Sequence, residues 1–187
     1  KMKILILSKP DDMHAAAVVW GLRRLGYQPI IWYAADFPRV NQGNFYFDFE
    51  GNPKVELTID GQNHKSPFDV IWNRRFGEPM PRGSSHLDDH KIIKIESREF
   101  LVNLYRFLGT ENTLWINPLN CSEIANSKFF QLKIAKEVGF NIPATIAGNS
   151  DYAVKEFFLK HAGKVVFKPF GTGGWVTREC ANVVLKT

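Results

Sequence analysis

Short apolar runs alternate with a stretch of helical periodicity at the start of the chain. Residues 3–7 and 29–33 are apolar runs of strand length, and residues 14–25 between them carry apolar side chains at helical spacing. Gly26 follows the helical stretch, where a helix end is expected. A strand, a helix and a second strand in this order predict a β-α-β unit, and hence a parallel sheet covered by helices.

The pattern then changes to strict alternation. Residues 45–49, which are mostly aromatic, and residues 54–59, which alternate strictly, flank a Glu-Gly-Asn-Pro turn and predict a hairpin with one solvated face. Another apolar run at 68–72 predicts a strand, and residues 88–108 place apolar side chains near one face of a long helix. We therefore expect an α/β domain over residues 1–117.

A second series of elements follows Asn117-Pro118, where we place a domain boundary. Residues 118–187 would form the second domain. Ser127 and Ser150 are suitable N-caps for two of its helices. The expected elements are a helix to about residue 125, a helix at 127–138, a strand at 142–146, a helix at 151–161 and a strand at 164–168.

Composition and charge argue against several classes of protein, partner and site. No apolar stretch approaches the ~20 residues of a membrane span or forms a signal-peptide core, so we expect a cytoplasmic protein with no membrane partner. The formal charge of +5 suits anionic ligands, but the basic residues form no stripe beside exposed aromatics, and no nucleic-acid partner is expected. Cys121 and Cys180 lack C-x-x-C spacing, so neither a disulfide framework nor a zinc site is predicted.

The end of the chain carries the clearest chemical pattern. Lys168 follows an apolar run, and shortly after it comes a glycine-rich turn formed by Gly171, Thr172, Gly173 and Gly174. Backbone N–H groups of such a turn approach phosphate oxygens closely, and a lysine supplies positive charge. Lys128 lies in the first turn of an expected helix, where the helix dipole disfavours a cation. A shared anionic ligand explains both lysines; alternatively, both are solvated and the turn is only a turn.

Arg74 and Arg75 directly follow the strand predicted at 68–72. Folds with parallel sheets place ligands at the carboxyl ends of strands, so these guanidinium groups are candidates for binding a substrate carboxylate or phosphate. Pairing with Glu78 or with the acidic start of the next helix is an equal alternative. The Asp-Asp-His run at 88–90 is not predicted to hold a metal, because neighbouring helical residues do not share a face.

Taken in order, several segments resemble the ATP-grasp ligases: WINP at 115–118, IANSK at 124–128, GFNIPAT at 139–145 and VVFKP at 165–169. Further segments resemble one branch of that family, which contains the microviridin-type peptide maturases and the ribosomal-protein glutamate ligases. They are ILIL at 4–7, DMHA at 12–15, IWNRR at 71–75 and ESR at 96–98.

The resemblance implies the N-terminal half of such an enzyme: a pre-ATP-grasp domain followed by the incomplete central part of an ATP-grasp module. It implies that Lys128, Lys168 and the glycine-rich turn at 171–174 contact the nucleotide. ATP would phosphorylate a carboxylate of a peptide or amino acid, and an amine or hydroxyl would displace phosphate from the acyl phosphate. The family's Mg²⁺ ligands belong to a C-terminal region that matches nothing in these residues, so Mg²⁺ is expected for the full-length enzyme.

Two functions remain open at this point. One is a fragment of an ATP-dependent ligase; the other is a non-catalytic module, derived from an ATP-grasp protein, that binds a peptide or an oligomeric partner. The strand-like run at 183–185 would have unpaired edges, which favours a homodimer. A nucleotide-dependent rise in melting temperature separates the two functions, because a ligand that binds the folded state stabilises it.

Overall fold

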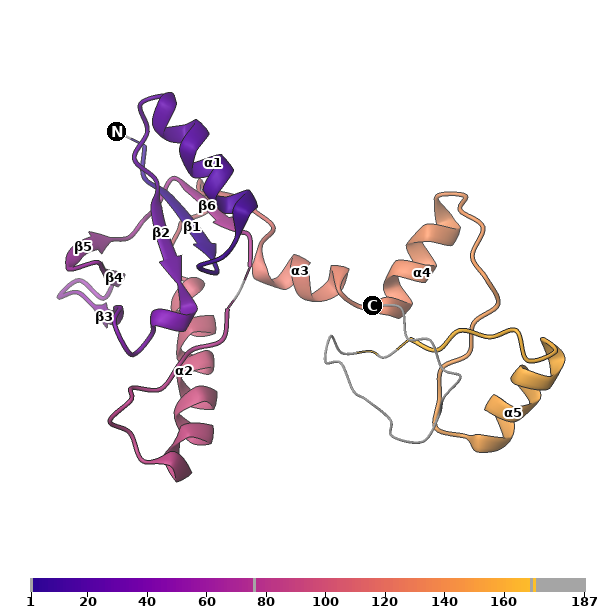
Figure 1. The fold of residues 1–187 in the computed structure, drawn as a ribbon. Helices are drawn as coiled ribbons and strands as arrows, with labels where there is room; N and C mark the ends of the chain where they lie inside the picture. Colours follow the sequence, from indigo (N-terminus) through magenta and orange to yellow (C-terminus); the bar gives the residue numbers. More distant parts are fainter. Residues whose placement is uncertain (1, 76, 169, 171–187) are drawn as a thin grey trace. The chain divides into compact units, whose positions relative to one another are not determined.

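The computed structural model describes residues 2–75, 77–168 and 170 (Figure 1). The chain divides by its internal contacts into two units, Lys1–Ser122 and Glu123–Thr187. The expected domain boundary at Asn117-Pro118 lies shortly before this division and stays a prediction. Each unit is described by itself below.

A four-stranded parallel sheet forms the centre of the first unit. Its strand order is β2-β1-β6-β7, which confirms the parallel sheet predicted from the alternation of strands and helices. The strands are β1 (Ile4–Ser8), β2 (Ile30–Tyr33), β6 (Val70–Asn73) and β7 (Leu114–Ile116). Helix α1 (Met13–Arg24) connects β1 to β2, also as predicted.

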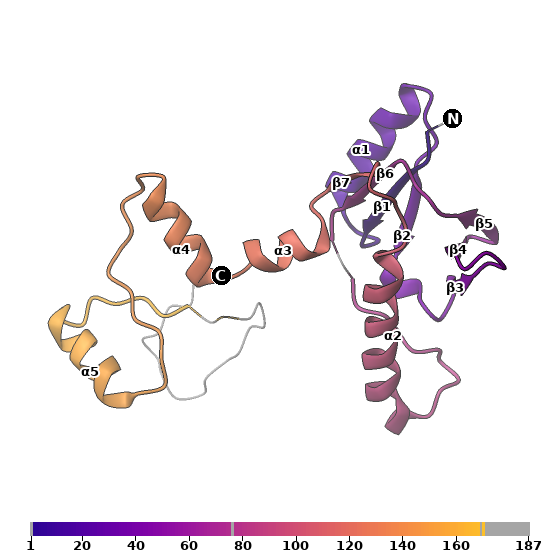
Figure 2. The ribbon, with the colours of Figure 1, turned by 180° about the vertical axis from the view of Figure 1, so that it is seen from behind.

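Alternate residues of β1 enter two separate cores. Ile4 and Ile6 pack with Ala15 and Val19 of α1 on one face of the sheet. Leu5 and Leu7 enter a larger core, which also contains Trp32 and Ile71 of the sheet, Val55 and Leu57 of the small sheet, and Leu101 and Leu104 of α2 (His90–Tyr105). Helix α2 lies on the side of the parallel sheet away from α1 (Figure 2). Because successive strand residues point to opposite faces, the continuous apolar run in β1 serves both cores.

The small sheet is antiparallel and has the order β3-β4-β5. The predicted hairpin is confirmed as β3 (Gln42–Phe47) and β4 (Pro53–Ile59). Strand β5 (Gln62–Lys65) was not predicted, because its side chains are polar and carry no alternation. Asp60 and Gly61 both have positive φ, so this Asp-Gly pair makes the tight turn between β4 and β5.

The first unit also contains short 3₁₀ turns at Ala34–Asp36 and Leu87–Asp89. The second of these leads into the predicted long helix.

The second unit contains helices whose caps were visible in the sequence. Helix α3 (Leu119–Ala125) crosses the division between the units, and α4 (Lys128–Glu137) and α5 (Asp151–Lys160) follow. The Ser127 and Ser150 hydroxyls accept hydrogen bonds from the N–H groups of Phe130 and Ala153, as expected of N-caps.

Two strand predictions in the second unit are wrong. Residues 142–146 and 164–168 form no strand, although their apolar side chains suit one. A strand requires a hydrogen-bonded neighbour, and within the described residues of this unit neither segment has one. No apolar side chain at 123–168 is buried, so the described part of this unit has no core of its own.

Candidate functional site

The carboxyl ends of β1 and β6 carry a charged cluster. Leu7 of β1 lies opposite Asn73 of β6, so the loops that follow these strands begin side by side. The backbone N–H groups of Arg74 and Arg75 both donate to the carbonyl of Leu7, at 3.0 and 3.1 Å. These bonds fix the two arginines beside the loop that connects β1 to α1.

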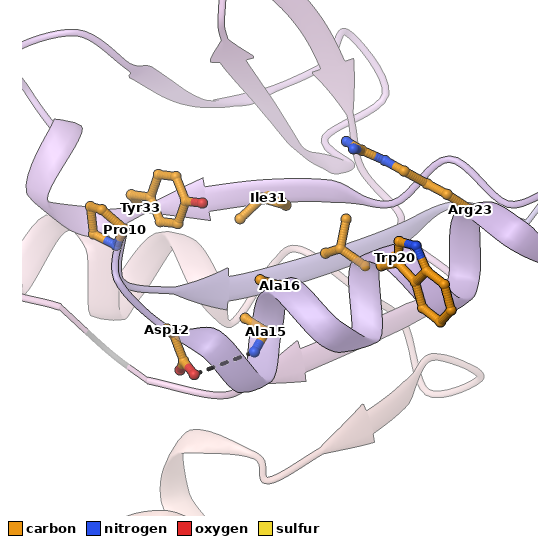
Figure 3. A pocket seen from close by; sticks show the side chains of 9 residues that line it. Pro10, Asp12, Ala15, Ala16, Trp20, Arg23, Ile31 and Tyr33 are labelled. Atoms are coloured by element: carbon orange, nitrogen blue, oxygen red, sulfur yellow. Dashed lines mark hydrogen bonds between the residues drawn. The ribbon is translucent and has the colours of Figure 1, made fainter.

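Asp12 lies at the centre of the charged cluster. Its Oδ1 accepts hydrogen bonds from the N–H groups of His14 and Ala15, at 3.1 and 3.3 Å, so it is the N-cap of α1 (Figure 3). Its Oδ2 accepts from the Ser8 hydroxyl at 3.2 Å and lies 3.3 Å from Nε of Arg74 and 3.5 Å from Nε of Arg75. One buried carboxylate therefore orders both the helix start and two guanidinium groups.

The alternative pairing of Arg74 and Arg75 with Glu78 or the acidic helix start is wrong. Both arginines pair with Asp12, and Glu78 pairs with Arg98 at 3.0 Å. Asp12 was not predicted to be a site residue. An acidic residue directly before a helical stretch is an N-cap signal, and that signal could have found it.

The charge of Asp12 is maintained inside the protein. Burial opposes ionisation of the carboxyl, but hydrogen bonds from Ala15, Ser8 and His14 and the positive charge of Arg74 outweigh it. The pKa of Asp12 is therefore below its ordinary value. At neutral pH this carboxylate is ionised and holds the two guanidinium groups.

The cluster retains an excess of positive charge, since two guanidinium groups share one carboxylate. Both contact Asp12 through Nε, and each guanidinium group carries four further N–H donors on its Nη atoms. The Arg74 side chain is 24% exposed and that of Arg75 is 52% exposed, so neither is fully buried. Fixed, paired guanidinium groups of this kind suit an incoming carboxylate or phosphate.

Replacing Asp12 with asparagine is expected to lower the melting temperature by several degrees at neutral pH. The charge on Asp12 stabilises the folded state at every pH above the ordinary carboxyl pKa of ~3.9, and this contribution disappears as the pH falls through the lower pKa of the folded protein. Thermal melts of the wild type and Asp12→Asn should therefore differ from pH 7 to about 5 and converge in stronger acid. Equal differences at pH 7 and pH 3 would contradict this reading of the cluster.

The second unit brings Lys128 to the segment that carries Lys168. The Lys128 ammonium donates to the carbonyl of Phe170 at 3.0 Å, and the rings of Phe129 and Phe170 meet edge to face with centroids 5.3 Å apart. Lys168 is exposed and does not end a strand, which corrects that expectation. The remaining predicted nucleotide contacts, Gly171, Thr172, Gly173 and Gly174, lie outside the described residues.

Other kinds of site find no support in the described part of the chain. Its His, Cys, Asp and Glu side chains form no group of three or more that could hold a metal ion. Cys121 is an exposed free thiol, and Cys180 lies outside the described residues. None of the described helices combines the length and the apolar character needed to cross a bilayer.

The fold of this chain is similar to that of several proteins of known structure. No family model matches the chain, and none of the curated proteins matches it. Among solved structures, macrocyclase MdnB from Microcystis aeruginosa is similar over 87% of this chain, with 25% identity and a TM-score of 0.76. Macrocyclase MdnC from the same organism, bound to its precursor peptide MdnA, is similar over 92%, with 20% identity and a TM-score of 0.79.

A RiPP-associated ATP-grasp ligase from Chryseobacterium gregarium, solved with ADP and a leader and core peptide, is similar over 87% of this chain, with 24% identity and a TM-score of 0.71. The chain spans about half the length of these structures, covering 53%, 56% and 49% of them. The resemblance to ATP-grasp ligases seen in the sequence is confirmed for the fold.

Proposed function

We propose that this chain, which has the fold of ATP-grasp peptide ligases over the half that it spans, is part of an ATP-dependent ligase acting on a peptide or amino-acid carboxylate. The proposed reaction phosphorylates that carboxylate, and an amine or hydroxyl then displaces phosphate from the acyl phosphate. The observation that carries the proposal is the fold match to MdnB and MdnC over 87% and 92% of the chain.

For the nucleotide, we assign Lys128 and Lys168 as phosphate contacts, together with the glycine-rich turn at 171–174. The bond from the Lys128 ammonium to the Phe170 carbonyl supports this assignment, because it holds the first lysine over the segment that carries the second. Related structures contain ADP, AMPPNP or Mg with ADP. ATP would supply the phosphoryl group, and Mg²⁺ would neutralise its charge; we assign no Mg²⁺ ligand among the described residues.

For the substrate, we assign Arg74 and Arg75 as the groups that bind a carboxylate. Asp12 contacts both through Nε, and their Nη donors would bind the incoming oxygens. Several structural neighbours were solved with precursor peptides, which makes a peptide the preferred substrate class. The paired guanidinium groups would orient its acidic side chain and screen its charge.

A thermal-shift titration with MgATP tests the nucleotide half of the proposal. The whole chain should be stabilised by about 1.4 kcal/mol when free MgATP is ten times its Kd, because the ligand binds the folded state. Lys128→Ala should need at least about tenfold more MgATP for the same shift, since a charged hydrogen bond to phosphate is worth roughly 1.5–3 kcal/mol. Lys136→Ala is the matched control on the same helix and should behave as the wild type.

The rival function is the non-catalytic module that binds a peptide or a partner. It predicts no shift with MgATP and a stabilising shift with a peptide alone. Equal MgATP shifts for the wild type and Lys128→Ala would reject the assigned lysine, and no shift at any concentration would favour the rival.

A further inference from the structure

A groove of about 250 Å³ lies between α1 and β2, next to the charged cluster (Figure 3). Ile31 and Tyr33 of β2 form one side of it. The other side is formed by α1, through Ala16, Val19, Trp20 and Arg23. Asp12 of the charged cluster also lines the groove, whereas the other side chains named here have no role in the ligase function proposed above.

Strand β2 is the outer strand of the parallel sheet on this side. Within the described residues it pairs with β1 alone, so part of its backbone N–H and C=O groups points away from the sheet. An unpaired strand edge can accept an extended peptide as an additional strand. The alternate side chains of such a peptide would share the face of Ile31 and Tyr33 and would enter the groove under α1.

Trp20 provides an apolar wall for that additional strand. Its side chain is 63% exposed although it lies on the helix that covers the sheet. The Arg24 guanidinium lies 5.2 Å from the centroid of the indole ring, and Trp20 also lines the groove. An apolar side chain placed between Trp20 and Ile31 would shield apolar surface of these two residues from water. Burial of apolar surface is the main favourable contribution to the free energy of such contacts.

The two ends of the groove differ in charge. Arg23 lines one end and is followed by Arg24, so this end is basic. Tyr33 lies at the other end, where burial and neighbouring carboxylates raise the pKa of its hydroxyl; the carboxylates belong to Asp36, Asp60 and Asp11. The groove therefore complements a segment with an acidic side chain at one end and a basic group at the other.

We propose that the α1–β2 groove binds an extended peptide that pairs with the edge of β2, with an apolar side chain against Trp20 and an acidic side chain at Arg23. The helix rises roughly 16 Å from Asp12 to Arg23, a length that matches about five residues of an extended strand. This site needs no nucleotide and stands independently of the proposed ligase activity.

Fluorescence anisotropy with the pentapeptide Lys-Val-Phe-Val-Glu, labelled at its lysine end, tests the site on the whole chain. Trp20→Ala should weaken binding about tenfold, as expected for a central aromatic contact. Val18→Ala is the matched control, because Val18 is exposed on α1 and does not line the groove. A peptide N-methylated at its phenylalanine and glutamate should lose binding, because in an antiparallel strand the residues that share the face of Ile31 and Tyr33 are the ones whose N–H groups donate to β2.

A charge exchange tests the orientation of the peptide. Arg23→Glu should weaken binding of the acidic probe, and replacing the probe's glutamate with lysine should restore it. All of these results should be the same with and without MgATP, which separates this site from the nucleotide proposal.

Several results would overturn the peptide site: equal affinities for Trp20→Ala and Val18→Ala, undiminished binding of the N-methylated probe, or no binding at millimolar concentration. Self-association of the chain that Trp20→Ala abolishes, without competition from the probe, would assign the groove to a second copy instead and would also overturn it.

Discussion

Replacing Leu104 with alanine is expected to lower the free energy of unfolding of the first unit by about 2–5 kcal/mol. Leu104 lies on α2, is 2% exposed and belongs to the core that joins this helix to both sheets. Removing its side chain leaves a cavity among well-packed neighbours, which the surrounding structure fills incompletely. Urea unfolding followed by tryptophan fluorescence measures the effect.

The control for Leu104→Ala is Ile95→Ala on the same helix. Ile95 is 50% exposed, so its replacement should change stability by no more than about 0.5 kcal/mol. Similar losses for the two variants would show that α2 does not present the face described here to the core.

Chymotrypsin should cleave the second unit at least about tenfold faster than the core of the first, because cleavage requires local opening and the second unit has little burial to oppose it. Phe140 and Phe158 are 67% and 47% exposed, whereas Phe68 and Tyr105 are each 1% exposed. Mass spectrometry of early fragments from the whole chain gives the rate at each site. Addition of urea above the unfolding midpoint should make the four rates similar. Equal rates without urea would contradict the difference in packing between the units.

The pattern of apolar and polar residues was enough to predict the β-α-β unit and the β3–β4 hairpin of the first unit. The apolar run in β1 and the helical spacing before Gly26 identified a parallel β-α-β arrangement, because burial on two faces demands those patterns. Strand β5 was not predicted, because it is stabilised by pairing with β4 after the Asp60-Gly61 turn and has no apolar pattern of its own.

The strands predicted at 142–146 and 164–168 failed for the opposite reason. Their apolar runs satisfy the local preference for extended structure, yet a strand also needs a neighbour to pair with. Local sequence reports the preference and cannot report the neighbour. The serine caps of α4 and α5 were predicted correctly because a cap is a local hydrogen bond within four residues.

In the candidate site, too, the local sequence did not show which distant residues meet. The sequence placed Arg74 and Arg75 at a strand end, but their partner, Asp12, is far away in the chain and meets them only because β1 pairs with β6. Lys128 and Lys168 were named from their local patterns and from a family resemblance, but the bond from Lys128 to Phe170 joins residues that lie far apart in the chain. Tertiary pairing, not residue type, decides such contacts.

If Lys128 and Lys168 contact the phosphates of ATP, as proposed above, both should react with an ATP-based affinity label. An ATP analogue with a reactive acyl group on its terminal phosphate acylates lysines within reach of the bound phosphates, and mass spectrometry identifies the modified residues. We expect labelling of Lys128 and Lys168 that excess MgATP prevents, with weak and unprotected labelling of Lys91 and Lys133. Labelling that is equal at all four lysines, or that excess MgATP leaves unchanged, would contradict this proposal.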